Sequence, residues 1–202
     1  LLIEGAIGNS ERELIDYLLR IYSNQLVLMG KGEFDALTGL LNRQAFDDRM
    51  KKVMSGEILV GRDGQADGLS FAIIDIDYFK QVNDKFGHLF GDEVLLLMAR
   101  LMTRSFRQCD MLFRYGGEEF AVLMTHKLDK SLIGLERFRA AVESFEFPQI
   151  GHKTVSIGVV EINSQELLST IIDKADKALY YAKNNGRNRI CVNDQGKTDF
   201  RA

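Results

Sequence analysis

Cysteine and proline are scarce in this 202-residue sequence, which contains two cysteines and one proline. The two cysteines, Cys109 and Cys191, have neither the CxxC spacing of a metal or redox site nor the number that a disulfide framework needs. We therefore expect a protein of a reducing compartment, the cytoplasm. No apolar run approaches the ~20 residues that span a bilayer, and no signal-peptide pattern opens the sequence. The net charge of −3 argues against a nucleic acid polymer as partner, so any phosphate would have to be bound by local clusters.

Residues 1–33 differ from the rest of the chain and are predicted to form a linker with a signalling helix. Ser10 and Glu13 have the spacing of a capping box, which predicts that a helix begins there. Apolar residues then follow in alternating steps of four and three, namely Ile15, Leu19, Tyr22, Leu26 and Met29. Two interpretations stay open: an amphipathic helix that packs on its own domain, or a coiled-coil helix that brings two subunits together. Because the sequence starts abruptly at Leu1, we expect an upstream sensor domain, with or without a membrane anchor, in the full-length parent.

Strand and helix patterns alternate through residues 34–202, which predicts one α/β sheet domain. The expected strands are 58–60, 69–76, 111–113, 120–124, 154–162 and 190–192. The expected helices are 44–54, a short one after Phe79, 92–106, 131–145 and 166–182, with a glycine-flanked loop at 84–91. Gly116 and Gly117 are predicted to form a two-residue turn, because glycine adopts the positive φ angles of such turns at little cost.

Four carboxylates lie at the ends of two of these predicted strands. Asp75 and Asp77 close the apolar run 69–76 and share one face, because side chains alternate along a strand. Glu118 and Glu119 follow the glycine turn on opposite faces, so the periodicity leaves open which of them meets Asp75. Such a group would destabilise the fold unless a cation or a hydrogen-bond network neutralised it. Mg²⁺ prefers oxygen ligands, and two such ions would stabilise the attacking and leaving oxygens of an in-line displacement at phosphorus.

Two further pairs of residues suit a nucleotide but also have structural interpretations. Lys183 and Arg187 are four residues apart, hence on one helical face if the helix persists, which suits a triphosphate. A single cation near a helix C-terminus, however, can simply complement the helix dipole. Asn83 and Asp92 flank the glycine-flanked loop. Asp92 is either an N-terminal helix cap or a carboxylate that accepts hydrogen bonds from guanine N1–H and its exocyclic amine.

Together these residues resemble the GGDEF family of diguanylate cyclases over roughly residues 34–194. Six motifs occur in the family's order: DALTGLLNR at 35–43, DIDYFKQVND at 75–84, GHLFGD at 87–92, RYGGEEF at 114–120, VSIGV at 155–159 and ADKALYYAKNNGRNR at 175–189. The resemblance implies an α/β (α+β) fold similar to the palm of polymerases and class III nucleotide cyclases. In that fold a central, mostly antiparallel sheet is flanked by helices. The resemblance also implies a reaction that condenses two GTP into cyclic di-GMP and releases two pyrophosphates.

The resemblance also implies a role for each matching residue. Asp75 and Glu118 would bind Mg²⁺, or Mn²⁺ in its place, together with the Ile76 carbonyl. Glu118 would also assist deprotonation of the 3′-hydroxyl, and Glu119 would be a further active-site carboxylate. The remaining residues would bind GTP: Gly116 and Gly117 by close approach of the backbone, Asn83 and Asp92 at guanine, Phe79 and Lys80 over the phosphates, and Lys183 and Arg187 at the β and γ groups.

Dimerisation and product inhibition follow from the same resemblance. The 3′-oxygen of one GTP attacks the α-phosphate of the other, so two domains must face one another in a two-fold homodimer. Arg107 and Asp110 match the family's RxxD inhibitory site for cyclic di-GMP, although such a pair is also common on protein surfaces. Two alternatives are an inactive sensor of GTP or cyclic di-GMP and a cyclase that also accepts ATP. The intact glycine and acidic positions argue against the first, and Asp92 argues against the second.

Overall fold

The computed structural model describes residues 32–57, 68–163, 165–194 and 197–200. Its helices are α2 (Arg43–Met54), α3 (Phe79–Phe86), α4 (His88–Ser105), α5 (Leu128–Ser144) and α6 (Leu168–Asn184). Its strands are β1 (Ser70–Ile76), β2 (Met111–Arg114), β3 (Glu119–Met124), β4 (Glu146–Phe147), β5 (Gly151–His152), β6 (Val155–Glu161), β7 (Ile190–Asp194) and β8 (Lys197–Phe200). The predicted helix near residues 10–29 and the strand at 58–60 lie outside the described residues. Within the described ranges, no helix is both long and apolar enough to cross a membrane.

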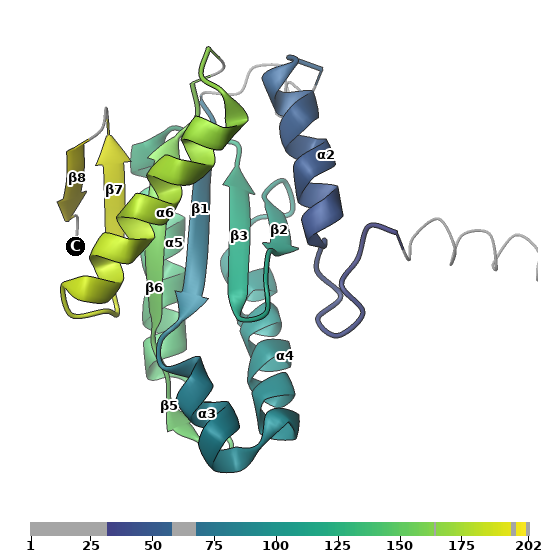
Figure 1. Cartoon of the computed structure of the whole chain (residues 1–202), viewed down its shortest axis with the longest axis vertical. Helices are drawn as coiled ribbons and strands as arrows, with labels where there is room; N and C mark the ends of the chain where they lie inside the picture. The colour runs from purple at the N-terminus through teal and green to yellow at the C-terminus, as the bar shows by residue number, and fades with distance from the viewer. Residues whose placement is uncertain (1–31, 58–67, 164, 195–196, 201–202) are drawn as a thin grey trace, which may run out of the picture.

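A six-stranded sheet in the order β2-β3-β1-β6-β7-β8 forms the centre of the fold (Figure 1). β1 lies between β3 and β6 and pairs antiparallel with both, whereas β6 and β7 are parallel. Every residue of β1 is buried, as its nearly unbroken apolar run predicts for a central strand that is covered on both faces. The expected central, mostly antiparallel sheet is confirmed.

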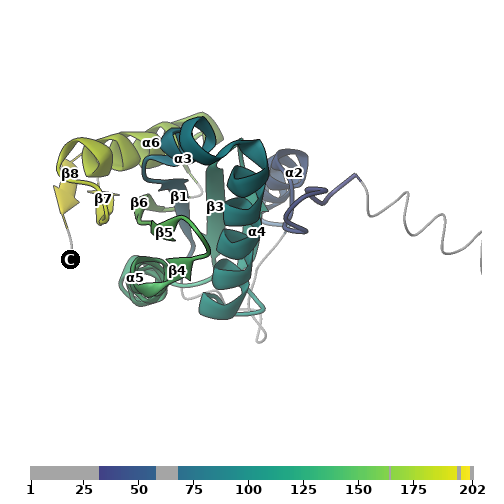
Figure 2. The same ribbon diagram turned by 90° about the horizontal axis from the view of Figure 1, so that it is seen from below.

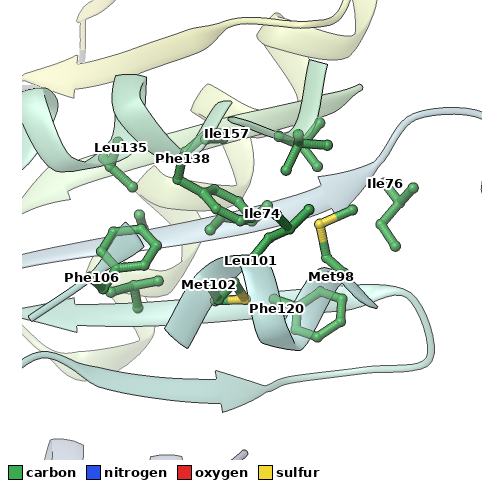
Figure 3. Packing of buried hydrophobic residues seen from close by; sticks show 14 of the residues in the cluster. Ile74, Ile76, Met98, Leu101, Met102, Phe106, Phe120, Leu135, Phe138 and Ile157 are labelled. Atoms are coloured by element: carbon green, nitrogen blue, oxygen red, sulfur yellow. The ribbon is translucent and has the colours of Figure 1, made fainter. Parts of the chain in front are cut away.

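Helices cover both faces of this sheet (Figure 2). On one face, Ile74 of β1 belongs to a core cluster with Met98 of α4 and Phe138 of α5 (Figure 3). On the other face, Phe71 of β1 belongs to a second cluster with Phe46 of α2 and with residues of α6. Because successive side chains of a strand point to opposite faces, β1 packs against an apolar cluster on each face of the sheet. This packing fixes the position of its last residues, Asp75 and Ile76, at the edge of the core.

Helix α6 approaches the sheet closely at Gly158 in β6. A Cβ added to Gly158 would overlap the carbonyl oxygen of Ala175 and the amide nitrogen of Leu179, and would lie 2.9 Å from the Leu179 Cα. A glycine inside a strand often marks such a close backbone approach. The arrangement places Lys183, near the end of α6, beside Asp75 at the end of β1.

Several predicted element boundaries are wrong. Helix α4 begins at His88 after Gly87, whose φ is +88°, so the expected loop at 84–91 is largely helical. Asp92 therefore lies inside α4 and is not its N-cap. Helices α5 and α6 also begin and end away from the predicted 131–145 and 166–182, and β4, β5 and β8 were not predicted. The residues before α4, α5 and α6 make no side-chain capping hydrogen bond, so no local signal marked these starts.

Candidate active site

Asp75 and Glu119 lie opposite one another on neighbouring strands. Asp75 is the second-last residue of β1, Glu119 is the first residue of β3, and the two are paired in the antiparallel register. Directly paired residues point to the same face, with Cβ atoms about 4.5–5.5 Å apart. The Asp75 residue is only 5% exposed. The register thus answers a question that periodicity left open, because it is Glu119 that stands directly opposite Asp75.

Burial and the neighbouring carboxylates raise the pKa of two carboxyl groups in this site, those of Asp75 and Glu118. Burial raises the pKa of Asp75, and the charges of Glu119 and Asp77 add to this, while Lys183 opposes it with its Nζ 2.7 Å from the Asp75 Oδ2. Burial also raises the pKa of Glu118, to which Asp75 and Glu119 add and which Lys183 again opposes. The site thus holds more negative charge than Lys183 neutralises, and a further cation would favour the ionised forms.

The connection between β2 and β3 is longer than predicted. Residues 115–118 link the two strands, and the amides of Tyr115 and Gly116 both donate to the Glu119 carbonyl, at 2.8 and 3.0 Å. Neither Gly116 nor Gly117 has a positive φ, so the predicted reason for the glycine pair is wrong. Space is the reason at Gly116, where an added Cβ would lie 2.6 Å from the Glu119 Oε2. At Gly117 an added Cβ would meet nothing within 4 Å, so this part of the loop is open.

An ion pair holds the glycine loop against the segment that precedes α2. The Arg114 guanidinium donates to both Asp35 carboxylate oxygens, at 3.0 and 3.2 Å, and to the Gly117 carbonyl at 2.9 Å. Thr38 donates to Asp35 through its N–H and its hydroxyl. Although burial opposes the shift, the Thr38 and Arg114 donors hold the pKa of Asp35 below its usual value. Both partners belong to motifs found in the sequence, but nothing in those motifs indicates that they pair.

Asp77 is held by hydrogen bonds from within the protein. It is 2% exposed and follows the end of β1. Its Oδ1 accepts a hydrogen bond from the Ser156 hydroxyl (2.7 Å), and its Oδ2 accepts from the Thr154 hydroxyl (2.6 Å) and the Asn188 N–H (3.0 Å). Of the two ways of neutralising a carboxylate that we expected, a cation or a hydrogen-bond network, Asp77 uses the second. It joins β1 to β6 and to the segment after α6.

Asn83 and Asp92 lie on the packed helices α3 and α4. The Asn83 Oδ1 is buried and has no hydrogen-bond partner among the described residues. It lies against Gly91, where an added Cβ would overlap it and would come within 3.3 Å of the Phe79 ring. Asp92 follows Gly91 and is exposed. An unsatisfied buried amide oxygen near an exposed carboxylate suits a polar ligand that supplies donors.

The two residues predicted to lie over the phosphates, Phe79 and Lys80, are at the N-terminus of α3. Phe79 opens α3 and is buried, whereas Lys80 is the next residue and is exposed. Ile76, whose carbonyl is a predicted ligand, is the buried last residue of β1. These residues therefore lie along one stretch of chain that runs from the end of the central strand into α3.

Lys183 and Arg187 do not share a helical face, because α6 ends at Asn184 and Arg187 has a φ of +59°. Lys183 pairs with Asp75. The Arg187 guanidinium instead lies over the ring of Tyr78, with Cζ 4.5 Å from the ring centroid. The expected common face is thus wrong. Both cations nevertheless reach the stretch 75–79, one at its first residue and the other at Tyr78.

Arg107 and Asp110 form a separate hollow at the other end of β2 and β3. The Arg107 N–H donates to the Asp110 Oδ2 at 3.0 Å, and its Nη1 lies 2.6 Å from the His126 Nε2. Beside them is a cavity of about 100 Å³. Its lining includes Arg107, Asp110, His126 and Arg137. The Asp110 Oδ1 is buried, with no hydrogen-bond partner in the described part of the chain.

The carboxylates fit a divalent ion whose coordination is completed by a substrate. Among the described residues, no three acidic, histidine or cysteine side chains converge to form a closed metal site. Mg²⁺ does not require one, because it is usually held by one or two carboxylates together with waters and substrate phosphates. Asp75, Glu118 and Glu119, with their mutual charge repulsion, supply that kind of donor set.

Comparison with known proteins decides the family. A family model described as "Diguanylate cyclase, GGDEF domain" matches residues 33–189. The chain belongs to the GGDEF domain family. The sequence motifs predicted this membership, and the match covers both the carboxylate site and the Arg107–Asp110 hollow of this GGDEF domain.

Curated relatives and solved structures agree with the assignment. Diguanylate cyclase DgcM of Escherichia coli is 39% identical over 157 residues, which is 77% of this chain and 37% of DgcM. Diguanylate cyclase DgcP of Pseudomonas aeruginosa is 40% identical over 162 residues, which is 78% of this chain and 23% of DgcP. This GGDEF domain thus spans well under half the length of these relatives.

Two solved structures resemble the fold closely. The coiled coil and GGDEF domain of DgcB from Caulobacter crescentus, in complex with c-di-GMP, has a TM-score of 0.77 and 29% identity, and the match covers 92% of this chain and 100% of that one. Diguanylate cyclase SiaD of Pseudomonas aeruginosa, in complex with its activator SiaC, has a TM-score of 0.73 and 34% identity over 90% of this chain and 69% of that one.

Proposed function

We propose that this GGDEF domain is a diguanylate cyclase, which condenses two GTP into cyclic di-GMP and two pyrophosphates. The observation that carries the proposal is the pairing of Asp75 with Glu119, beside Glu118 and Lys183. It places mutually repelling carboxylates at the end of a buried strand and an ammonium group next to them. Such a site suits a nucleotide that arrives with divalent ions. The names of the curated relatives support the same reaction.

We infer that Mg²⁺, with Mn²⁺ as an alternative, would be held by Asp75, Glu118, Glu119 and the Ile76 carbonyl. When bound, such ions stabilise negative charge on the attacking and leaving oxygens. Glu118 is the candidate to receive the proton of the 3′-hydroxyl. Glu118 interacts electrostatically with Asp75 and Glu119, and bound cations would favour its ionised form, which is the form that can accept a proton.

The remaining predicted residues would bind the nucleotide. Asn83 and Asp92 would bind guanine, and Asp92 would select it over adenine, which offers no N1–H donor. Gly116 leaves room for the Glu119 carboxylate and Gly117 is open, so the loop backbone could lie close to the nucleotide. Four residues would bind the phosphates, namely Phe79, Lys80, Lys183 and Arg187.

We further propose that catalysis needs a homodimer. One domain holds one GTP, whose 3′-oxygen must attack the α-phosphate held by another domain, so two domains must face one another. Residues 1–33 would form the signalling helix that controls this encounter, and residues 34–202 the catalytic domain. An upstream sensor would supply the signal. We place the reaction in the cytoplasm, in line with the number and spacing of Cys109 and Cys191, which suit no disulfide framework.

Incubation with GTP and Mg²⁺ tests the proposed reaction. We expect cyclic di-GMP and pyrophosphate on chromatographic separation of the products, and neither product from ATP. Because dimerisation could limit the rate, the assay includes a version of the chain fused to a dimeric coiled coil. Failure of the fused protein to release pyrophosphate would favour the alternative, an inactive sensor of GTP or cyclic di-GMP, which direct binding would then reveal.

Substitution of Arg107 by alanine should weaken product inhibition and leave the initial rate unchanged. The cavity beside Arg107 and Asp110 is the candidate inhibitory site for cyclic di-GMP, and it lies at the far end of β2 and β3 from the carboxylates. Hydrogen bonds to charged groups contribute about 1.5–3 kcal/mol, so half-inhibition should need about tenfold more product or above. Progress curves with added cyclic di-GMP measure this. Arg104→Ala, which removes an exposed arginine outside the cavity lining, is the matched control. Identical inhibition of the wild type and the Arg107 variant would exclude the site.

A further inference from the structure

Tyr78 makes two contacts with the Arg187 guanidinium, although the residues are far apart in the sequence. The Arg187 Cζ lies 4.5 Å from the centroid of the Tyr78 ring, and its Nη1 lies 3.3 Å from the Tyr78 Oη. A guanidinium over an aromatic face is attracted by the ring quadrupole. Tyr78 is nevertheless 52% exposed, so burial of its ring in the core does not explain its position.

The backbone on both sides fixes this contact. Tyr78 and Arg187 both have a φ of +59°, a left-handed conformation that is uncommon for residues other than glycine. The neighbours of both residues are tied together, because the N–H of Asn188 donates to the Asp77 Oδ2. The Arg187 N–H in turn donates to the Ala182 carbonyl at 3.0 Å, which holds the chain against the end of α6. The two side chains therefore meet between two anchored segments.

The position of the pair matters for the nucleotide. Tyr78 directly precedes Phe79 and Lys80, which open α3, and Arg187 follows the helix that carries Lys183. A partly exposed arginine such as Arg187 otherwise samples many rotamers, and it loses that freedom when it binds a ligand. A ring that holds the guanidinium in advance lowers this loss.

We propose that the Tyr78 side chain is a positioning residue that holds the Arg187 guanidinium ready for the β- and γ-phosphates of GTP. The inference rests on the proposed function, because it assumes that Arg187 contacts the phosphate tail. Tyr78 acts on the substrate through Arg187, so its removal should affect binding of the phosphate tail and leave guanine binding as it was.

Two substitutions at Tyr78 separate its contacts. Tyr78→Phe keeps the ring and loses the hydroxyl contact, and should raise the KM for GTP less than about twofold. Tyr78→Leu removes the aromatic face but keeps a Cβ in the left-handed backbone. It should raise the KM about two- to fivefold, the range of an exposed cation–π contact, with kcat nearly unchanged. The double variant Tyr78→Leu/Arg187→Ala should bind no more weakly than Arg187→Ala alone.

Direct binding, measured with Ca²⁺ in place of Mg²⁺, distinguishes the positioning role from a general disturbance of the structure around Tyr78. Isothermal titration with GTP should show the same weakening as the KM, whereas titration with GMP, which lacks the β- and γ-phosphates, should be unchanged. Equal weakening of GTP and GMP, or additive effects of the two substitutions, would overturn the positioning role. A dimer-enforced protein that makes no cyclic di-GMP would instead overturn the proposed function, and an Arg187→Ala variant with unaltered GTP affinity would overturn the phosphate contact of Arg187 on which the inference rests.

Discussion

Substitution of Glu118 by glutamine is expected to reduce cyclic di-GMP formation by about 10²- to 10⁴-fold, the usual contribution of a general base. Glutamine keeps the shape of the side chain but can neither accept the 3′-hydroxyl proton nor present a charged oxygen to a divalent ion. The rate is measured with saturating GTP and Mg²⁺ on the dimer-enforced protein. Glu161→Gln serves as the control, because Glu161 is exposed and pairs with Ser70 at the other end of β1.

The fold should survive this change. The pKa of Glu118 is raised by burial and by Asp75, so its ionised form is less favourable in the folded protein than in the unfolded chain. A carboxyl with a raised pKa stabilises the fold only as the pH falls through that pKa, and it costs stability above it. Removal of the charge should therefore leave the melting temperature of the metal-free protein unchanged or higher. Full activity of Glu118→Gln would move the metal-binding role to Glu119, and Glu119→Gln would then be the inactive variant.

Substitution of Gly158 by alanine should strongly destabilise the folded protein, although it adds only one methyl group. The new Cβ would overlap backbone atoms of Ala175 and Leu179 in α6, and backbone cannot yield by a rotamer change. Overpacking typically costs about 1–3 kcal/mol and sometimes more, and we expect the upper end, about 3 kcal/mol. For a chain of this length that corresponds to a fall in melting temperature of about 6–12 °C. Activity should fall as well, because α6 carries Lys183 to Asp75.

The same substitution, glycine to alanine, should have the opposite effect on stability at Gly134. It lies inside α5, and the nearest atom that an added Cβ would meet beyond the adjoining helix backbone is a Phe106 ring carbon at 3.9 Å. Alanine in a helix interior is more favourable than glycine by roughly 0.5–1 kcal/mol, so Gly134→Ala should raise the melting temperature slightly. Thermal unfolding of the two variants beside the wild type measures both effects. A Gly158→Ala protein as stable as the wild type would mean that α6 does not approach β6 as closely as described.

The sequence predicted the sheet, and it singled out Asp75, Glu119 and Lys183, which the structure brings together, because the relevant signals are local. The apolar run 69–76 reads as a buried strand, and six motifs in order identify the family. Strand register is not local. Periodicity could not decide between Glu118 and Glu119, and the β1–β3 pairing places Glu119 opposite Asp75. Nor could spacing show that α6 stops at Asn184, which separates Lys183 from Arg187.

The sequence left the role of Asp77 open and misjudged that of Gly116, because the partners of both residues are set by the fold. Asp77 looks like Asp75 in the sequence, yet its partners Ser156 and Asn188 lie about 80 or more residues away. The glycine pair was explained by turn geometry, whereas Gly116 is needed for the room that the Glu119 carboxylate takes. In both cases tertiary contacts, which a single sequence does not display, decide the role.

The ion pair between the Lys183 ammonium group and Asp75 affects how the protein folds in the absence of metal ions and nucleotide. A pocket with its own counter-ion does not depend on an added ion to fold, unlike small domains that are unfolded without their metal. Chelation of Mg²⁺ should therefore abolish the proposed cyclase activity without unfolding the protein, and addition of the ion should restore that activity at once. Newly synthesised chains would then accumulate in a folded but inactive state until nucleotide and metal ions bind together.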